Sequence, residues 1–126
     1  LSPYRPWIKK AVVDGGGHNH RQNLSDAVLI KENHIRIAGG ITAAVQQIRK
    51  QVSTFIEVEV TNLEEVKQAV ALDVQRLLLD NMTNEMIAEA VQLVPDTIET
   101  EASGNMPPAR IQQLSAIEGL DFVSVG

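Results

Sequence analysis

Apolar residues recur along this chain with two periods, one typical of strands and one typical of helices. Residues 55–60 alternate apolar and polar side chains, whereas residues 39–52 place apolar side chains three and four positions apart. Similar apolar segments recur, and the expected strands begin near positions 27, 55, 76, 97 and 121. Because helices separate these strands, the pattern predicts a parallel sheet with right-handed crossovers.

Residues that favour helix starts precede three of the expected helices. Thr61 or Asn62 can cap one helix with its side chain, and Thr83 or Asn84 can cap the next. Residues 107–117 begin with two prolines, which are favoured in the first turn of a helix. The helices are therefore expected to lie between successive strands.

The segments near the N-terminus are less regular. Residues 1–7 contain two prolines and are expected to be irregular, and residues 10–13 are expected to form a short strand. The segment after Lys31, which carries Asn33 and His34, is expected to be a loop.

The fold class expected from this pattern is α/β, with about five or six parallel strands, and the family resemblance described below implies that they form an incomplete βα barrel of the TIM type. A complete eight-stranded barrel takes about 250 residues, whereas this chain has 126. We therefore expect residues 1–126 to be part of a barrel domain whose closing C-terminal segment is absent. Such an open sheet leaves strand edges and apolar surface uncovered, so we expect the segment alone to fold poorly or aggregate.

Composition narrows the classes of protein. Apolar residues make up 44% and charged residues 21%, which is typical of a globular domain. No apolar run approaches the roughly 20 residues that a membrane-spanning helix needs. The net charge of −5 disfavours a general nucleic-acid surface. The sequence has no cysteine, which excludes disulfides and thiolate nucleophiles and fits a cytoplasmic protein.

Residues 15–33 combine three consecutive glycines with two histidines, an arginine and a lysine. Consecutive glycines permit a sharp turn or a close approach to a bulky group. Arg21 offers a rigid fork of donors that matches a carboxylate or a phosphate, and Lys31 adds a point charge. The segment is a candidate anion pocket, although a glycine turn followed by a solvated basic residue has the same composition.

Polar and small residues occur where the expected strands end. In a βα barrel these C-terminal ends open on one face, where ligands bind, and phosphate commonly sits in the loops after the last two strands. The chain therefore gathers a cation, two carboxylates and a small-residue anion loop around one opening. The residues are Lys31, Glu59, Asp80, Ser103, Gly104 and Gly126.

Each candidate has a structural alternative. Glu59 could face solvent, yet strands buried on both faces are usually apolar, so Glu57 and Glu59 would be costly there without a role. Asp80 could only cap the following helix, and residues 103–105 could form an ordinary turn. A metal site is a further alternative. Its possible ligands would be His18, His20 and His34.

Six motifs occur in a characteristic order and spacing. They are GGGHNHR (15–21), DAVLIKENH (26–34), EVEV (57–60), LLLDNM (77–82), EASGN (101–105) and DFVSVG (121–126). In this order they resemble quinolinate phosphoribosyltransferase, the carboxylating nicotinate-nucleotide pyrophosphorylase of NAD biosynthesis. The resemblance covers about residues 9–126, and the first two motifs joined are highly specific.

The resemblance implies a glycosyltransferase reaction between quinolinate and phosphoribosyl pyrophosphate, with Mg²⁺ present. The ring nitrogen of quinolinate attacks the anomeric carbon, pyrophosphate leaves, and loss of carbon dioxide gives nicotinate mononucleotide. Mg²⁺ would bind mostly through pyrophosphate and water, with protein ligands unknown. The resemblance also implies an N-terminal domain outside residues 1–126 and a homodimer or higher homo-oligomer. We therefore expect no activity from these residues alone.

The resemblance further implies a role for each matching residue. Quinolinate would contact His20, Arg21 and Lys31, and Lys31 would lie close to both substrates. Glu59 and Asp80 would hold the ribose hydroxyls and stabilise the cationic, oxocarbenium-like sugar. Lys31, Glu59 and Asp80 are the expected catalytic residues. The phosphoribosyl phosphate would be bound by Ser103, Gly104, Asn105 and Gly126, although members of the family often have glycine at the position of Asn105.

Two other functions fit the same residues. One is a related protein associated with molybdenum transport, which shares much of the barrel. The other is a non-catalytic module that binds a phosphosugar.

Overall fold

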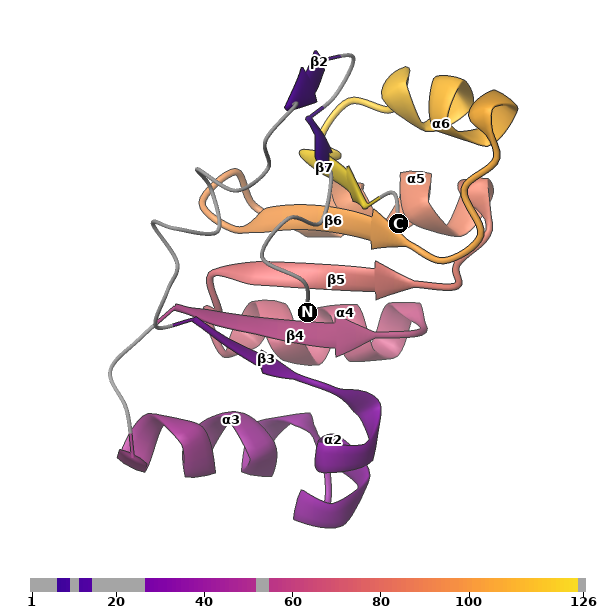
Figure 1. The fold of residues 1–126 in the computed structure, drawn as a ribbon. Helices are drawn as coiled ribbons and strands as arrows, with labels where there is room; N and C mark the ends of the chain where they lie inside the picture. Colours follow the sequence, from indigo (N-terminus) through magenta and orange to yellow (C-terminus); the bar gives the residue numbers. More distant parts are fainter. Residues whose placement is uncertain (1–6, 10–11, 15–26, 52–54, 125–126) are drawn as a thin grey trace.

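The computed structural model describes residues 7–9, 12–14, 27–51 and 55–124, which form one sheet with helices packed against it (Figure 1). The strands are β1 (Trp7–Lys9), β2 (Val12–Asp14), β3 (Val28–Ile30), β4 (Ile56–Val60), β5 (Arg76–Asp80), β6 (Glu99–Ser103) and β7 (Phe122–Ser124). The helices are α2 (Glu32–Ala38), α3 (Ile41–Gln51), α4 (Leu63–Ala71), α5 (Asn84–Leu93) and α6 (Pro108–Ser115). None of these helices is long and apolar enough to cross a membrane.

Strands β3 to β7 are parallel and lie in the sheet in the same order as in the sequence. Because the order never reverses, right-handed crossovers place the connecting helices on one face. Figure 1 shows α4 and α5 behind the strands. This arrangement is that of a βα barrel and not of a doubly wound sheet, whose strand order reverses at a switch point. The predicted α/β fold class is confirmed, with five parallel strands in the described ranges and a sheet that they leave open.

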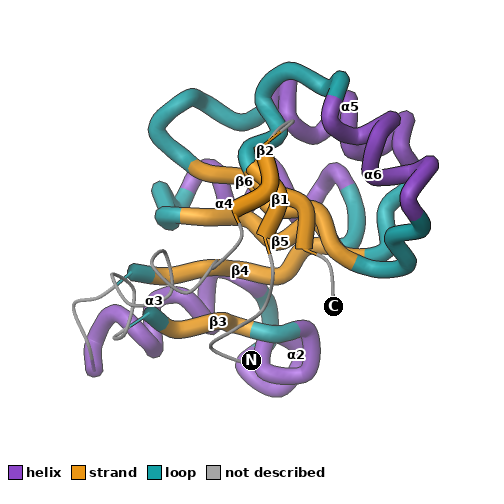
Figure 2. The backbone as a smooth tube through the Cα atoms, turned by 45° about the horizontal axis from the view of Figure 1, so that its top comes forward, coloured by secondary structure: helices purple, strands orange, loops and turns teal. Residues whose placement is uncertain are grey.

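A two-stranded hairpin extends the sheet beyond β7. Strand β1 pairs antiparallel with both β2 and β7. The hairpin therefore lies at one edge of the sheet, and β3 is the strand at the other edge (Figures 1 and 2). Residues 1–7 were expected to be irregular, but Trp7 already belongs to β1. The expected strand at residues 10–13 corresponds to β2, which is antiparallel and begins at Val12.

The face of the sheet toward the helices is apolar. Ile56, Val58 and Val60 of β4 belong to one buried cluster with Leu77 and Leu79 of β5. The helices contribute to the same cluster through Val45, Val66, Ile87 and Leu114. These side chains alternate along each strand, as expected for a sheet that packs one face against helices.

The opposite face carries buried charges, with Arg76 at its centre. Arg76 is 0% exposed and is paired in register with Glu57 on β4 and Glu99 on β6. Its Nη2 lies 2.6 Å from Glu99 Oε1, and its Nη1 lies 3.9 Å from Glu57 Oε1. The guanidinium carbon lies 5.0 Å from the ring centroid of Phe55 and 4.8 Å from that of Phe122. Ion pairs and aromatic faces together compensate the burial of this cation.

The predicted helix starts are confirmed. The Asn62 side chain accepts a hydrogen bond from Glu65 N at 2.9 Å, and the Thr83 hydroxyl accepts one from Met86 N at 3.2 Å. Pro107 and Pro108 begin α6, which ends at Ser115. The ends of elements differ from the expected ones by about two residues, a common uncertainty at helix and strand termini.

The expected loop after Lys31 is wrong, because residues Glu32–Ala38 form helix α2. Ile35 of this helix is buried in the core. Gly39 ends it in the left-handed region, with φ of 98°, and donates its N–H to Ile35 O and Arg36 O. Lys31 provides no side-chain cap, so the usual local sign of a helix start is missing.

Replacing Arg76 with methionine is expected to lower the free energy of unfolding by about 3 kcal/mol, because the buried Glu57 carboxylate loses its counter-charge. The measurement is urea unfolding of the full-length protein followed by circular dichroism. Arg36→Met is the matched control, since Arg36 is exposed on α2. The double variant R76M/E57Q should recover part of the loss. Equal stability of the Arg76→Met and Arg36→Met variants would contradict the prediction.

Candidate functional site at the C-terminal edge of the sheet

The C-terminal ends of the parallel strands bring together most of the described candidate residues. Lys31 follows β3, Glu59 lies near the end of β4, and Asp80 ends β5. Ser103 ends β6 and is paired in register with Asp80. The predicted gathering of a cation, two carboxylates and a small-residue loop at one edge is therefore found in the structure.

Asp80 and Ser103 form a direct contact across the two strands. The Ser103 hydroxyl donates a hydrogen bond of 2.9 Å to Asp80 Oδ1. Ser103 is buried and Asp80 is half-buried, so the carboxylate remains partly open to the edge of the sheet. Asp80 does not cap the following helix, because Thr83 has that role. The structural alternative for Asp80 is therefore wrong.

Glu59 contacts the segment that begins helix α2. Its Oε1 accepts a hydrogen bond of 2.9 Å from the backbone N–H of Glu32, which lies 27 positions away in the sequence. Val58 and Val60 face the helices, so the alternation of the strand directs Glu59 to the same face as Arg76 and Asp80. Glu59 is half-buried. It is neither a core residue nor a fully solvated one.

The turns after β5 and β6 pack closely against each other. Asn81 has a φ of 55° and donates its N–H to Ser103 O at 3.2 Å. Gly104 has a φ of 119°, and a Cβ atom there would lie 2.8 Å from Asn81 Oδ1. The backbone conformation therefore favours glycine at position 104, and a Cβ there would require the Asn81 side chain to shift. Residues 103–105 are consequently more constrained than an ordinary surface turn.

Arg110 links the turn after β5 to the turn after β6 through hydrogen bonds. It is not among the site residues predicted from the sequence. Its guanidinium donates to Asn105 O at 2.7 Å, to Asn84 Oδ1 at 2.9 Å and to Met82 O. One side chain thus holds the loop after β5 and the loop after β6 in fixed relation. Its place in the first turn of α6, next to the EASGN motif, is the only signal in the sequence that could have indicated this contact.

Several candidates lie at the margin of the site or outside the described residues. Lys31 and Asn105 are exposed. His18, His20, Arg21 and Gly126 lie outside the described ranges, so their roles stay predictions. Within the described ranges, no group of three or more histidine, aspartate or glutamate side chains could hold a metal ion. The histidine metal site therefore stays an untested alternative.

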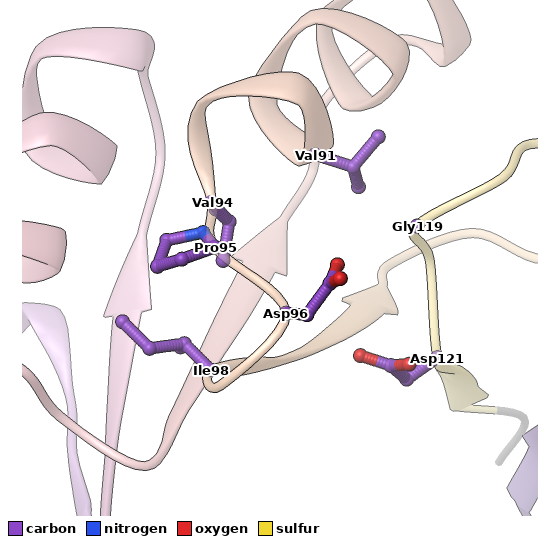
Figure 3. A pocket seen from close by; sticks show the side chains of 7 residues that line it. All are labelled: Val91, Val94, Pro95, Asp96, Ile98, Gly119 and Asp121. Atoms are coloured by element: carbon purple, nitrogen blue, oxygen red, sulfur yellow. The ribbon is translucent and has the colours of Figure 1, made fainter.

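A separate pocket of about 220 Å³ lies beside the N-terminal ends of β6 and β7 (Figure 3). Its carboxylates come from Asp96 and Asp121, and Asp121 Oδ2 accepts a hydrogen bond of 2.9 Å from Thr100 N. In a βα barrel this end stabilises the fold, whereas ligands bind at the opposite end. The remaining lining residues are Val91, Val94, Pro95, Ile98 and Gly119.

Strand order and edge residues define a barrel-type α/β protein with a candidate site for an anionic ligand at its C-terminal edge. The sequence model of the family described as quinolinate phosphoribosyl transferase, C-terminal domain, matches residues 3–126. The chain belongs to this family. The resemblance of the six motifs is thereby confirmed.

Several similar proteins are named nicotinate-nucleotide pyrophosphorylase (carboxylating). The chain is 45% identical over 115 residues to a probable nicotinate-nucleotide pyrophosphorylase (carboxylating) from Synechocystis, covering 87% of this chain and 39% of that protein. It is 38% identical to the chloroplastic nicotinate-nucleotide pyrophosphorylase (carboxylating) from Arabidopsis thaliana, covering 94% of this chain and 39% of that protein. The chain thus spans less than half the length of these relatives.

Solved structures agree with the fold. The nicotinate-nucleotide pyrophosphorylase from Francisella tularensis is 47% identical and superposes with a TM-score of 0.78, covering 89% of this chain and 40% of that one. The enzyme of that name from Ehrlichia chaffeensis is 36% identical, also with a TM-score of 0.78, covering 86% of this chain and 40% of that one.

Replacing Gly104 with alanine is expected to destabilise the full-length protein more than replacing Gly39 with alanine. Both positions have positive φ, which costs a side chain about 1 to 2 kcal/mol. Only position 104 adds a close contact, because a Cβ at Gly39 would meet nothing within 4 Å. Urea unfolding measures the difference between the variants. Equal losses would show that Asn81 moves away without cost.

Proposed function

We propose that the full-length protein transfers a phosphoribosyl group from phosphoribosyl pyrophosphate to quinolinate and releases carbon dioxide. The observation that carries this proposal is the gathering of Lys31, Glu59, Asp80 and Ser103 at one edge of the sheet, in a chain of this family. The names of the Synechocystis and Arabidopsis relatives support the same activity.

The first step of the reaction forms a C–N bond and breaks a C–O bond. The ring nitrogen of quinolinate attacks the anomeric carbon of the sugar, and pyrophosphate leaves with the electron pair of the broken bond. The carboxylate next to the ring nitrogen is then lost as carbon dioxide, and the carbon that carried it takes up a proton. The product is nicotinate mononucleotide.

Glu59 and Asp80 are proposed to stabilise the sugar as it gains positive charge. Both carboxylates are half-buried and are held by hydrogen bonds from Glu32 N and Ser103 Oγ. Carboxylates fixed in advance need little rearrangement when charge develops, and such preorganisation is often the largest contribution to catalysis. Their remaining acceptor capacity suits the hydroxyl groups of a ribose.

The two substrates carry negative charge that the chain has to compensate. Quinolinate is a dianion, and His20, Arg21 and Lys31 are proposed to bind it, with Lys31 near both substrates. For the 5′-phosphate we propose the turn after β6 together with the end of the chain, where glycines permit close approach of the backbone. The proposed contacts are Ser103, Gly104, Asn105 and Gly126.

Magnesium is proposed as the cofactor, bound mainly through pyrophosphate and water. Mg²⁺ prefers oxygen ligands and commonly keeps several waters, so one or two carboxylates are sufficient on the protein side. No residue is assigned as its ligand, because the charges of Glu59 and Asp80 are proposed to act on the sugar. When bound, the ion would neutralise charge on the leaving pyrophosphate.

The proposal also covers the oligomeric state and the cellular location of the full-length protein. A homodimer or higher homo-oligomer is proposed, as the family resemblance implies. A cytoplasmic location is proposed from the cysteine-free sequence. Plant relatives are named as chloroplastic or mitochondrial proteins, so the location differs among organisms.

The test is an assay of the full-length protein with quinolinate, phosphoribosyl pyrophosphate and Mg²⁺. We expect carbon dioxide and nicotinate mononucleotide to form in equimolar amounts. If a folded protein binds a phosphoribosyl ligand but forms no product, the molybdenum-transport relative or the phosphosugar-binding module takes the place of the enzyme.

Neutralising the carboxylate of Glu59 or of Asp80 should lower kcat by about 100-fold with a smaller change in KM, because the negative charge acts mainly in the transition state. The variants are Glu59→Gln and Asp80→Asn. Glu89→Gln is the matched control, since Glu89 is exposed on α5. Steady-state kinetics with each substrate varied in turn gives both constants. A rise in KM at unchanged kcat would instead mean that these residues only bind.

A further inference from the structure

Helix α2 begins at Glu32 without a side-chain cap from Lys31, and the carboxylate of Glu59 is bonded to its first N–H. The distance from Glu32 N to Glu59 Oε1 is 2.9 Å. We propose that this backbone N–H holds Glu59 in the orientation that catalysis requires, which makes residue 32 a positioning residue. The inference rests on the proposed function, because it assigns a role within that reaction.

The contact joins two strands immediately beyond their last paired residues. Ile30 of β3 is paired with Val58 of β4, so the chain after Ile30 runs beside the segment that carries Glu59. Lys31 and Glu32 are the next two residues. The hydrogen bond therefore fixes the Glu59 carboxylate relative to the backbone of Lys31, whose side chain is proposed to lie close to both substrates.

A backbone N–H orients the carboxylate without neutralising it. A lysine or arginine partner would offset the negative charge, whereas a peptide N–H leaves the full charge to face a cationic sugar. A carboxylate has about four lone-pair sites on two oxygens, so one bond at Oε1 leaves capacity for a ribose hydroxyl. The first N–H groups of a helix have no partner within the helix, so this donor is available for the purpose.

Proline at position 32 removes this single donor with little other change. Glu32 is the first residue of α2, where proline is tolerated because its fixed φ suits the helix. A residue before proline is restricted to extended conformations. Lys31 already has φ of −90° and ψ of 166°, which meets that restriction. The reference variant is Glu32→Ala, which removes the same side chain but keeps the N–H.

The first experiment compares Glu32→Pro with Glu32→Ala in the full-length protein. We expect kcat of the proline variant to be about tenfold lower than that of the alanine variant, with KM for quinolinate unchanged. In a Glu59→Ala background the same pair should differ by less than about twofold, because the bond is already absent. Equal kcat values for proline and alanine in an active protein would overturn the inference.

The second experiment does not depend on activity or on proline being accepted. Amide hydrogen exchange is measured at Glu32 in the full-length protein and in the Glu59→Ala variant, by NMR. Loss of the acceptor should speed exchange at Glu32 at least about tenfold, while exchange at Ile35, bonded to Lys31 O, stays the same. Unchanged exchange at Glu32 would refute the contact. If the unmodified protein makes no product although exchange behaves as expected, the proposed function fails and the contact remains.

Discussion

The in-register parallel ladder from β3 to β7 is the constraint on which the candidate site depends. Asp80 and Ser103 are 23 positions apart in the sequence, yet their side chains form a 2.9 Å hydrogen bond because β5 and β6 pair them directly. Side chains alternate between the two faces of a sheet, so a slip of one residue would turn Asp80 toward the helices. The geometry of the edge is therefore set by pairing that runs the whole length of the strands.

Arg76 contributes to this register at the other end of the same face. It forms ion pairs with Glu57 and Glu99, which are its direct neighbours on the two adjacent strands. A buried ion pair adds little net stability, but an unpaired buried charge is costly. A slip of two residues that brings Phe55 and Thr97 beside Arg76 would keep every side chain on its face and still separate these charges, whereas the opposite slip would place Glu59 and Glu101 beside Arg76. The ion pairs thus penalise a two-residue slip in one of its two directions, which the alternation of side chains alone would tolerate.

Local patterns in the sequence predicted much of the fold, and contacts between distant residues account for what they missed. Alternation in β4 and the capping residues Asn62 and Thr83 were readable because each acts on nearby backbone. Helix α2 was missed because the carboxylate at its first N–H comes from Glu59, 27 positions away. The hydrogen bonds by which Arg110 links two loops were also missed, because they too join residues that the local pattern does not relate. The edge candidates were predictable because parallel strands place their ends together.

Besides Glu101, which is buried on the same face, four carboxylates on the face of the sheet away from the helices have partners of two kinds. Glu57 and Glu99 lie beside the guanidinium of Arg76, which offsets their charge. In the described part of the chain, the bonds to Glu59 and Asp80 come from a peptide N–H and a hydroxyl, which are neutral. Neutral donors orient a carboxylate and leave its charge available, as stabilisation of a cationic sugar requires. The pairing of these four carboxylates thus separates the two that stabilise the fold from the two proposed to act on the substrate.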